Sequence, residues 1–479
     1  MKKTYYFIVA LFTLSIYSSN AQTKKWTLEE CVTYALKNNI SIKQNELGIK
    51  SAIIDKKVAF GNFLPNLNGN IAHSWSIGSN TNPVTNAREN LTTQYSQVGI
   101  GSSVTLYDGL QKINTYRREK LAIIASQYQL DKMKDDIALN VANAYLQILF
   151  SKEALKVQTE QLTFDEKQFK RTEELVHVGT IPKGDLLDAK ATVAADKQRV
   201  ATSENDLFLS KLSLAQLLQL DDLQNFDVDD ANFEPEPSQV MLQEPKAIIE
   251  KAKSDRIELK IAKTNLEIAE KNIKIAKSGY QPTLSAGYNF GTNASYSDRI
   301  SGYSINPSNP TSIVGYVDGT GQNVLSPNYT ATFKGPDALF NQLSNNKGHN
   351  FQLSLQIPIF NGFSVKNNIE RSKIALERSK IAETQATQDL ERNVYTAITN
   401  AKGALNSFEA AHAALDARKE AFNYAQSKFA VGMMNAFEFS QAQTLYVNAQ
   451  SEVLRTKYDY IFKVKVVEFY FGIPIIKNK

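Results

Sequence analysis

The chain has 479 residues, with 54 basic and 49 acidic side chains and a single cysteine. The near balance of charge gives no reason to expect a nucleic-acid partner, and one cysteine excludes an intramolecular disulfide framework or a cysteine-rich metal site. A chain of this length usually has about three domains, but internal similarity replaces that expectation with two repeats of one unit.

The first residues have the pattern of a secretion signal. Lys2 and Lys3 precede an apolar run over residues 5–17, and a small-residue cleavage site ends at Ala21. The alternative is a membrane anchor, but the run is shorter than the roughly 18 apolar residues that a span requires. We predict a signal peptide at residues 1–21 and an exported mature chain.

A helical segment is expected from Thr27 to about Phe63. Thr27 and Glu30 have the spacing of a capping box, and the pattern predicts a break near residues 38–39. Cys31 lies among apolar residues at helical spacing, so we expect it to be a buried apolar side chain.

Strand-like alternation follows Pro65 and again Pro282. Apolar residues alternate with small polar ones over about ten positions, which is typical of transmembrane barrel strands; a hairpin on a soluble core would give the same pattern. Four strands are predicted, at about 66–78, 92–107, 283–296 and 350–360. The turns between paired strands, about 79–91 and 297–348, are rich in Asn, Ser, Gly and Pro and are expected to be loops on the far side of the membrane from the helices.

Four strands are too few to close a membrane barrel. An open sheet edge in lipid would leave backbone groups unpaired at several kcal/mol each. The chain must therefore oligomerise if the strands span a membrane, and three copies would supply twelve strands, within the known range of such barrels.

Two long stretches carry a seven-residue apolar repeat and end at a Val-Gly pair. The first runs from Gly109 to Gly179, and the second, from Gly362 to Gly432, lies 253 residues later. The repeat passes through Val141, Ile148, Leu155, Leu162, Phe169 and Val176, and through Val394, Ala401, Phe408, Leu415, Phe422 and Phe429. This period predicts supercoiled helices rather than a globular core.

The long helices are expected at about 110–178 and 363–431. Each is followed by a bend, at about 179–184 and 432–437, and then by a returning helix in which the spacing of seven resumes. Pro182 and Gly184 supply the first bend, and Gly432 with Asn435 supplies the second. Each repeat therefore forms a long antiparallel helical hairpin.

An acidic, proline-containing stretch separates the repeats. We assign residues 22–220 to repeat 1 and residues 246–479 to repeat 2. Residues 221–245 are expected to form a linker that crosses the surface between them. Repeat 2 has 36 extra residues, all of them between Pro282 and Gly362.

These features resemble the TolC-like outer-membrane efflux proteins over essentially the whole mature chain. The resemblance is carried by Tyr107-Asp108-Gly109 and Phe360-Asn361-Gly362, by Val178-Gly179 followed by Asp185, Leu186, Leu187 and Ala189, and by Val431-Gly432 followed by Glu438, Phe439 and Ala442. It implies a homotrimer in the bacterial outer membrane, with a twelve-stranded barrel and a helical tunnel in the periplasm. It also implies that the tip docks on a periplasmic adaptor, a membrane fusion protein that links the channel to an inner-membrane efflux pump or ABC transporter.

The resemblance also implies a constriction inside the tip. The family's acidic positions fall on Glu438 and Gln441, of which only the first is acidic, so a single ring of three glutamates is expected. Three negative charges near a threefold axis repel one another and attract cations, so the ring of glutamates would act as an electrostatic gate. Asp185 is the third candidate. For Asp185 and Glu438 the alternative is stabilisation by the helix dipole alone.

A set of exposed, mostly apolar residues is expected at the tip. Its members are Val178, Gly179, Thr180, Val431, Gly432, Met433 and Met434. Exposed apolar groups in water need a partner, so we expect them to dock on the adaptor, although the glycines could simply end helices. The two methionines could ligate a soft metal, but an adaptable contact surface explains them as well.

Catalysis has no support in the sequence. The four histidines, His73, His177, His349 and His412, are scattered, and no metal-ligand spacing or phosphate-binding glycine loop is present. We predict no enzyme activity, no cofactor and no metal site. The alternative to a passive export channel is a non-transporting structural or adhesive coiled-coil protein of the envelope.

Overall fold

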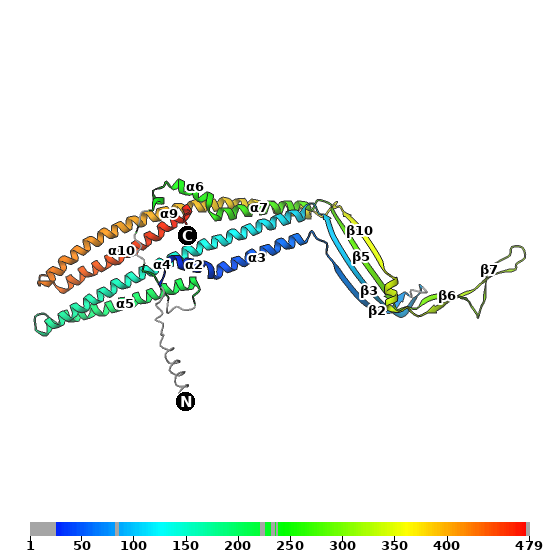
Figure 1. Ribbon diagram of the computed structural model, residues 1–479, viewed down its shortest axis with the longest axis horizontal. Coiled ribbons are helices and arrows are strands. Elements are labelled where there is room, and N and C mark those ends of the chain that lie inside the picture. The colour runs from blue at the N-terminus through cyan, green and yellow to red at the C-terminus, as the bar shows by residue number, and fades with distance from the viewer. Residues whose placement is uncertain (1–24, 82–85, 221–225, 231–234, 236–237, 476–479) are drawn as a thin grey trace, which may run out of the picture. The chain divides into compact units, whose positions relative to one another are not determined.

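A computed structural model describes residues 25–81, 86–220, 226–230, 235 and 238–475. The predicted signal peptide and parts of the predicted linker lie outside these residues. The chain divides into two units: a helical unit, made of the residues up to Ile53, Lys120–Ala269 and those from Ala375, and a sheet unit, made of Ile54–Glu119 and Glu270–Ile374 (Figure 1).

The helices come in two series of equal lengths. The first series is α2 (Leu28–Asn38), α3 (Ile40–Gly61), α4 (Gln111–His177) and α5 (Lys183–Leu218); the second is α6 (Pro245–Asp255), α7 (Ile257–Ser278), α9 (Ser364–Ala430) and α10 (Ala436–Phe471). The lengths are 11, 22, 67 and 36 residues in both series. These equal lengths accord with an internal duplication, which stays a prediction. Among the described residues, every helix is too short or too polar to cross a membrane.

Local interactions fix where the first helices begin and end. The Thr27 hydroxyl accepts from the backbone N–H of Glu30 and the Glu30 carboxylate accepts from that of Thr27, so the predicted capping box is confirmed. The predicted break falls at Asn39, whose side chain donates to the carbonyl of Leu217. The corresponding break at Arg256, between α6 and α7, was not expected from the sequence.

The seven-residue repeats face inward in the helical unit. None of the repeat positions named above is exposed, and Val141, Ile148, Val394 and Ala401 are fully buried. One core cluster joins α2, α4 and α5, and a second joins α6, α9 and α10. Cys31 is completely buried in the first cluster, as predicted, and burial raises the pKa of its thiol to about 12.

The sheet unit holds one four-stranded antiparallel sheet. Its strands, in spatial order, are β10 (Gly348–Gln356), β5 (Thr283–Ser295), β3 (Arg88–Tyr107) and β2 (Asn68–Thr81). The prediction of a mainly α-helical fold is confirmed, and the four predicted strands correspond to the four strands of this sheet, although the chain has further short strands. The strands β2 and β3 extend into the expected turn at 79–91, and β10 ends four residues before the expected position, 360.

The expectation that residues 297–348 form only a loop is wrong. This segment holds β6 (Arg299–Ile305) paired with β9 (Tyr329–Lys334), β7 (Thr311–Tyr316) paired with β8 (Asn323–Pro327), and α8 (Leu339–Asn345). The β-branched and aromatic residues among the polar ones favour strands. The short helix α8 is held on the main sheet because Gln342 both donates to and accepts from the backbone of Ser295.

The described part of the linker is not merely a surface connection. Strand β4 (Asp227–Val228) pairs in parallel with β1 (Lys25–Trp26), and Phe226 and Val228 are buried in the first core cluster. The 3-10 helix η2 (Gln239–Leu242) buries Val240 in the second cluster. Apolar residues spaced among the acidic ones therefore anchor this segment.

Candidate functional site: the sheet and the ends of the helical hairpins

The register of the sheet gathers its apolar residues on one face. Cα partners on neighbouring antiparallel strands point to the same face. The pairs include Ile71 with Val98, Ile100 with Phe290, and Tyr288 with Phe351. Ile71, Ile77 and Phe351 are 84%, 82% and 80% exposed. A continuous exposed apolar surface of this kind indicates an apolar environment or partner.

The opposite face is polar but nearly uncharged. It carries Asn68, Asn70, Gln97, Asn289, Asn293, Asn350 and Gln352, with Gly99, Gly101, Gly287 and Gly291 among them. The strands β2, β5 and β10 contain no Asp, Glu, Lys or Arg. The glycines leave room for the amides: a Cβ on Gly99 would lie 2.6 Å from Oδ1 of Asn70.

Both edges of this sheet, β2 and β10, are open in the single chain. Soluble proteins usually protect such edges with charged residues, proline or a covering segment. Neither strand contains a charged residue or a proline. Edges of this composition are suited to pairing with another strand.

The two helical hairpins turn through the same backbone motif. Gly179 and Gly432 have φ values of +78° and +76°, which favour glycine. The residue after each glycine donates its backbone N–H to a carbonyl five residues earlier. Thr180 donates to the carbonyl of Leu175, and Met433 donates to the carbonyl of Lys428. This is the Schellman arrangement that ends helices. The helix-ending role of both glycines is thereby established, and adaptor docking stays a prediction.

The returning helices begin differently. Asn435 is the N-cap of α10 and accepts from the backbone N–H of Glu438 at 2.8 Å. Pro182 is the N-cap of α5 and offers no side-chain bond. Gly184 was predicted to belong to the bend, but it lies inside the first turn of α5.

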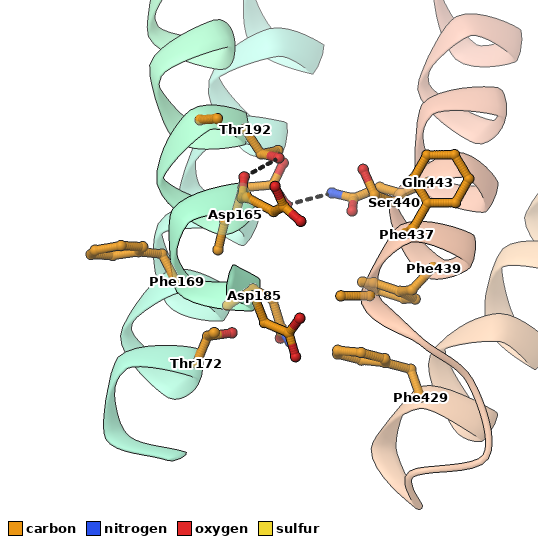
Figure 2. A pocket seen from close by; sticks show the side chains of 15 residues that line it. Asp165, Phe169, Thr172, Asp185, Thr192, Phe429, Phe437, Phe439, Ser440 and Gln443 are labelled. Carbon is orange, nitrogen blue, oxygen red and sulfur yellow. Dashed lines mark hydrogen bonds between the residues drawn. The ribbon is translucent and has the colours of Figure 1, made fainter. Parts of the chain in front are cut away.

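The predicted constriction residues differ in their exposure to solvent. Glu438 and Gln441 are exposed on α10, whereas Asp185 is half-buried. Asp185 lines a cavity of about 320 Å³ bounded by α4, α5, the end of α9 and the start of α10. Figure 2 shows Asp185 beside Phe429 and Phe439. The predicted docking residues lie in the two bends, where Met434 is half-buried and the others are exposed.

The structure reveals a buried polar group that sequence reasoning missed. Asp165 on α4 is 6% exposed and Asp196 on α5 is 1% exposed. Gln443 on α10 donates from Nε2 to Oδ1 of Asp165 at 2.8 Å, the contact drawn in Figure 2. A signal was available in the sequence. Asp165 follows the repeat position Leu162 by three residues, and Asp196 follows Val193, one of the positions at a spacing of seven in the first returning helix, by three residues, so both lie on the buried stripe.

The surroundings of Asp196 disfavour its charged form. Burial, reinforced by the neighbouring Asp165 carboxyl, raises the pKa of Asp196 to about 7. Arg199 opposes this shift by donating to Oδ1 of Asp196 at 2.8 Å. Asp196 Oδ2 is buried and receives no hydrogen-bond donor. Among the described residues, no group of three or more His, Cys, Asp or Glu side chains is placed to hold a metal ion.

The sequence was compared with models of known protein families and with curated proteins. The model of a family described as outer membrane efflux protein matches residues 32–219 and 248–464. No curated protein matches the sequence.

Solved structures are similar over nearly their whole length. The CmeC outer membrane channel of Campylobacter jejuni gives a TM-score of 0.71 at 16% identity, covering 94% of this chain and 87% of that one. The outer membrane protein VceC of Vibrio cholerae gives 0.72 at 13% identity, covering 93% and 96%. CusC gives 0.72 at 17% identity, covering 95% of each chain. At these identities the likeness establishes the fold.

Proposed function

Because the chain belongs to the outer membrane efflux protein family, we propose that three copies form a channel through which substrates leave a bacterial cell. In this proposal the sheets close a barrel in the outer membrane, and the helical hairpins extend into the periplasm. A periplasmic adaptor and an inner-membrane pump deliver the substrate, and the channel itself conducts passively.

The two-faced sheet with open edges carries this proposal. Lipid cannot hydrogen-bond an unpaired edge, so strands within a membrane must belong to a closed barrel. If β2 of one copy pairs with β10 of the next, three copies close a ring of twelve strands. The apolar face then contacts lipid, and the face with Asn68, Asn289 and Asn350 lines an aqueous lumen.

The long helices supply the periplasmic part. A helix of 67 residues, such as α4 or α9, is about 100 Å long at about 1.5 Å per residue. Heptad packing stabilises each hairpin from within, and the wall of a tunnel needs only the lateral association of such hairpins from three copies.

The bends are proposed as the docking surface for the adaptor. Val178, Val431 and Met433 are 71%, 70% and 76% exposed. Three copies would present six such bends around one ring, and with them this apolar set three times. An adaptor that covers it would remove apolar surface from water, which favours binding.

The constriction is proposed at Glu438. Asn435 fixes the start of α10, which places the exposed Glu438 and Gln441 three residues apart on one face of that helix. A ring of three Glu438 carboxylates would attract cations and hinder anions. Asp185 lies in the cavity inside one chain and would influence this ring only indirectly.

The experiment is to express the full chain in a Gram-negative host, fractionate the membranes, and compare heated with unheated samples on denaturing gels. We expect an outer-membrane protein that migrates as a trimer until heated and conducts ions in planar bilayers. A monomer that is soluble without detergent would overturn the proposal and favour the non-transporting coiled coil.

A further inference from the structure

Asp165 and Asp196 form a buried carboxyl pair within the first helical hairpin. They line a cavity of about 150 Å³ together with residues from α4, α5 and α10. The facing residues of α10 are all uncharged: Ser440, Gln443, Thr444, Val447 and Asn448. A cavity this polar, with a carboxyl group 1% exposed, is a place where a single proton changes the local energy strongly.

The hydrogen bonds around the pair are divided unevenly. Asp165 accepts from two amides, Gln161 on its own helix and Gln443 on α10, so both of its oxygens are satisfied as a carboxylate. Asp196 accepts from Arg199 through Oδ1. Its Oδ2 has no donor, and a buried carboxylate oxygen left in that state is strongly destabilising.

A proton on Oδ2 of Asp196 resolves this imbalance. The oxygen then becomes a donor, and the neighbouring Asp165 carboxylate is the acceptor. Two carboxyl groups that share a buried site retain one proton because their charges repel. We propose that Asp165 and Asp196 hold one proton between them, and that its release to solvent loosens the contact of α10 with the α4–α5 hairpin.

The surrounding charges support this assignment. Burial, followed by interaction with Asp165, raises the pKa of Asp196 to about 7, so the proton would be lost within the physiological range. The charged groups that face Asp196 are Asp165 from α4 and Arg199 from its own helix, and none comes from α10. The Arg199 side chain is 53% exposed, so solvent screens its compensating charge.

Loss of the proton weakens the contact with α10 in particular. The second negative charge repels the first, and the pair must separate or admit water. Gln161 and Arg199 lie on the same helices as the aspartates they bond and can follow them. Gln443 comes from another hairpin, so its bond to Asp165 is the one at risk. This inference does not depend on ion conduction or on the number of copies in the assembly.

The shared proton is tested by infrared spectroscopy of the full chain in detergent. Most Asp and Glu side chains lose their protons near pH 4, so a carboxylic-acid carbonyl band that disappears between pH 6 and 8 isolates the raised groups. We expect Asp196→Asn to remove such a band and Asp165→Asn to move it to lower pH. Asp188→Asn, on the same helix, should leave it in place.

Asp135 needs its own comparison, because burial also raises the pKa of its carboxyl. The variant Asp135→Asn separates its band from that of the pair. A titration between pH 6 and 8 that is unchanged in both Asp196→Asn and Asp165→Asn would overturn the shared proton.

The loosening is tested by hydrogen exchange of residues 440–448, corrected for the intrinsic dependence on pH. In the wild type we expect exchange to rise several-fold between pH 6 and pH 8.5. In Asp196→Asn, which mimics the protonated pair, the corrected rate should stay constant. Equal corrected rates in the wild type at both pH values would show that the proton does not control the contact, and would overturn that part of the inference.

Discussion

Gln443 on α10 and Asp165 on α4 are joined by a hydrogen bond of 2.8 Å although they are 278 residues apart in the sequence. Both side chains are at least 94% buried, at 4% and 6% exposed. Phe439, one turn away on α10, lies 6.3 Å from the ring of Phe164, the neighbour of Asp165. A polar bond and an aromatic contact thus connect the first hairpin to the second at the same level.

The first prediction concerns this bond. We expect Gln443→Leu to lower the free energy of unfolding by about 1.5–3 kcal/mol. Leucine is similar in size to glutamine, but it cannot donate a hydrogen bond to the buried carboxylate of Asp165. The measurement is thermal unfolding followed by circular dichroism in one detergent. Gln441→Leu, exposed on the same helix, is the matched control and should leave the midpoint unchanged. Equal midpoints for Gln443→Leu and wild type would show that the bond adds nothing.

A second prediction follows from the ion pairs that anchor the linker. Burial alone would raise the pKa of Asp227, but hydrogen bonds from Lys211 and Lys152 hold it below its ordinary value. The two ammonium groups lie 3.0 Å from its Oδ1. A folded-state pKa below the unfolded one stabilises the fold above about pH 4, and this contribution is lost as the pH falls through the folded-state value.

The experiment compares Asp227→Asn with wild type between pH 7 and pH 3. At pH 7 the variant should be less stable by about 1–3 kcal/mol, and the difference should shrink towards pH 3. Asp229→Asn is the control, since the neighbouring carboxylate makes neither of these ion pairs. A difference that stays constant over the whole range would contradict the assignment of the pKa shift.

The sequence predicted the regular parts of the fold well because two physical periods specify them. The heptad positions from Val141 onwards and the alternation around Ile71 each place one face inward or outward regardless of distant contacts. Segment 297–348 has neither period over a long run, so its two short strand pairs, β7 with β8 nested between β6 and β9, were missed. The break at Arg256 was missed although it lies at the repeat equivalent of Asn39: Pro65 and Pro282 are 217 residues apart, and so are Asn39 and Arg256.

The site residues were less predictable where their properties depend on contacts between helices that are distant in the sequence. Gly179 and Asn435 act through bonds within five residues, and their local roles could be anticipated. Asp165 and Asp196 acquire their properties only from the approach of α4, α5 and Gln443 on α10. A charged residue on an apolar stripe was the available warning, but its partner lies on another hairpin and no spacing in the sequence reveals it.

A third prediction separates backbone strain from steric conflict at the strand-to-helix junctions. Gly109 and Gly362 both have positive φ, +68° and +58°. A Cβ at Gly109 would lie 2.5 Å from Cβ of Gln281, whereas one at Gly362 would meet nothing within 4 Å. We expect Gly362→Ala to cost about 1 kcal/mol through strain alone, and Gly109→Ala to cost clearly more. The ratio of assembled to unassembled protein on unheated gels is the measurement; equal losses would contradict it.

The fourth prediction tests which face of the sheet contacts lipid. Phe351 and Gln352 are adjacent on β10 and point to opposite faces. Phe351→Lys should destabilise insertion by about 2–4 kcal/mol, because it places a charge in lipid. Gln352→Lys should insert normally, since its side chain would lie in the aqueous lumen. The measurement is the free energy of folding of each variant into vesicles of the same lipid. A larger loss for Gln352→Lys than for Phe351→Lys would mean that the faces are exchanged.

The last prediction concerns ion selectivity at the proposed constriction. Glu438 and Gln441 lie on the exposed face of α10, and in the proposed threefold channel each position would form its own ring of three side chains. Glu438→Gln should lower the preference for cations over anions severalfold, because the ring loses its negative charge. Gln441→Glu should raise it by adding a second ring. Reversal potentials across a salt gradient in planar bilayers measure both changes. Glu420→Gln, on the exposed surface of α9, is the control for a general charge effect, and shifts of equal size in all three variants would place the selectivity elsewhere.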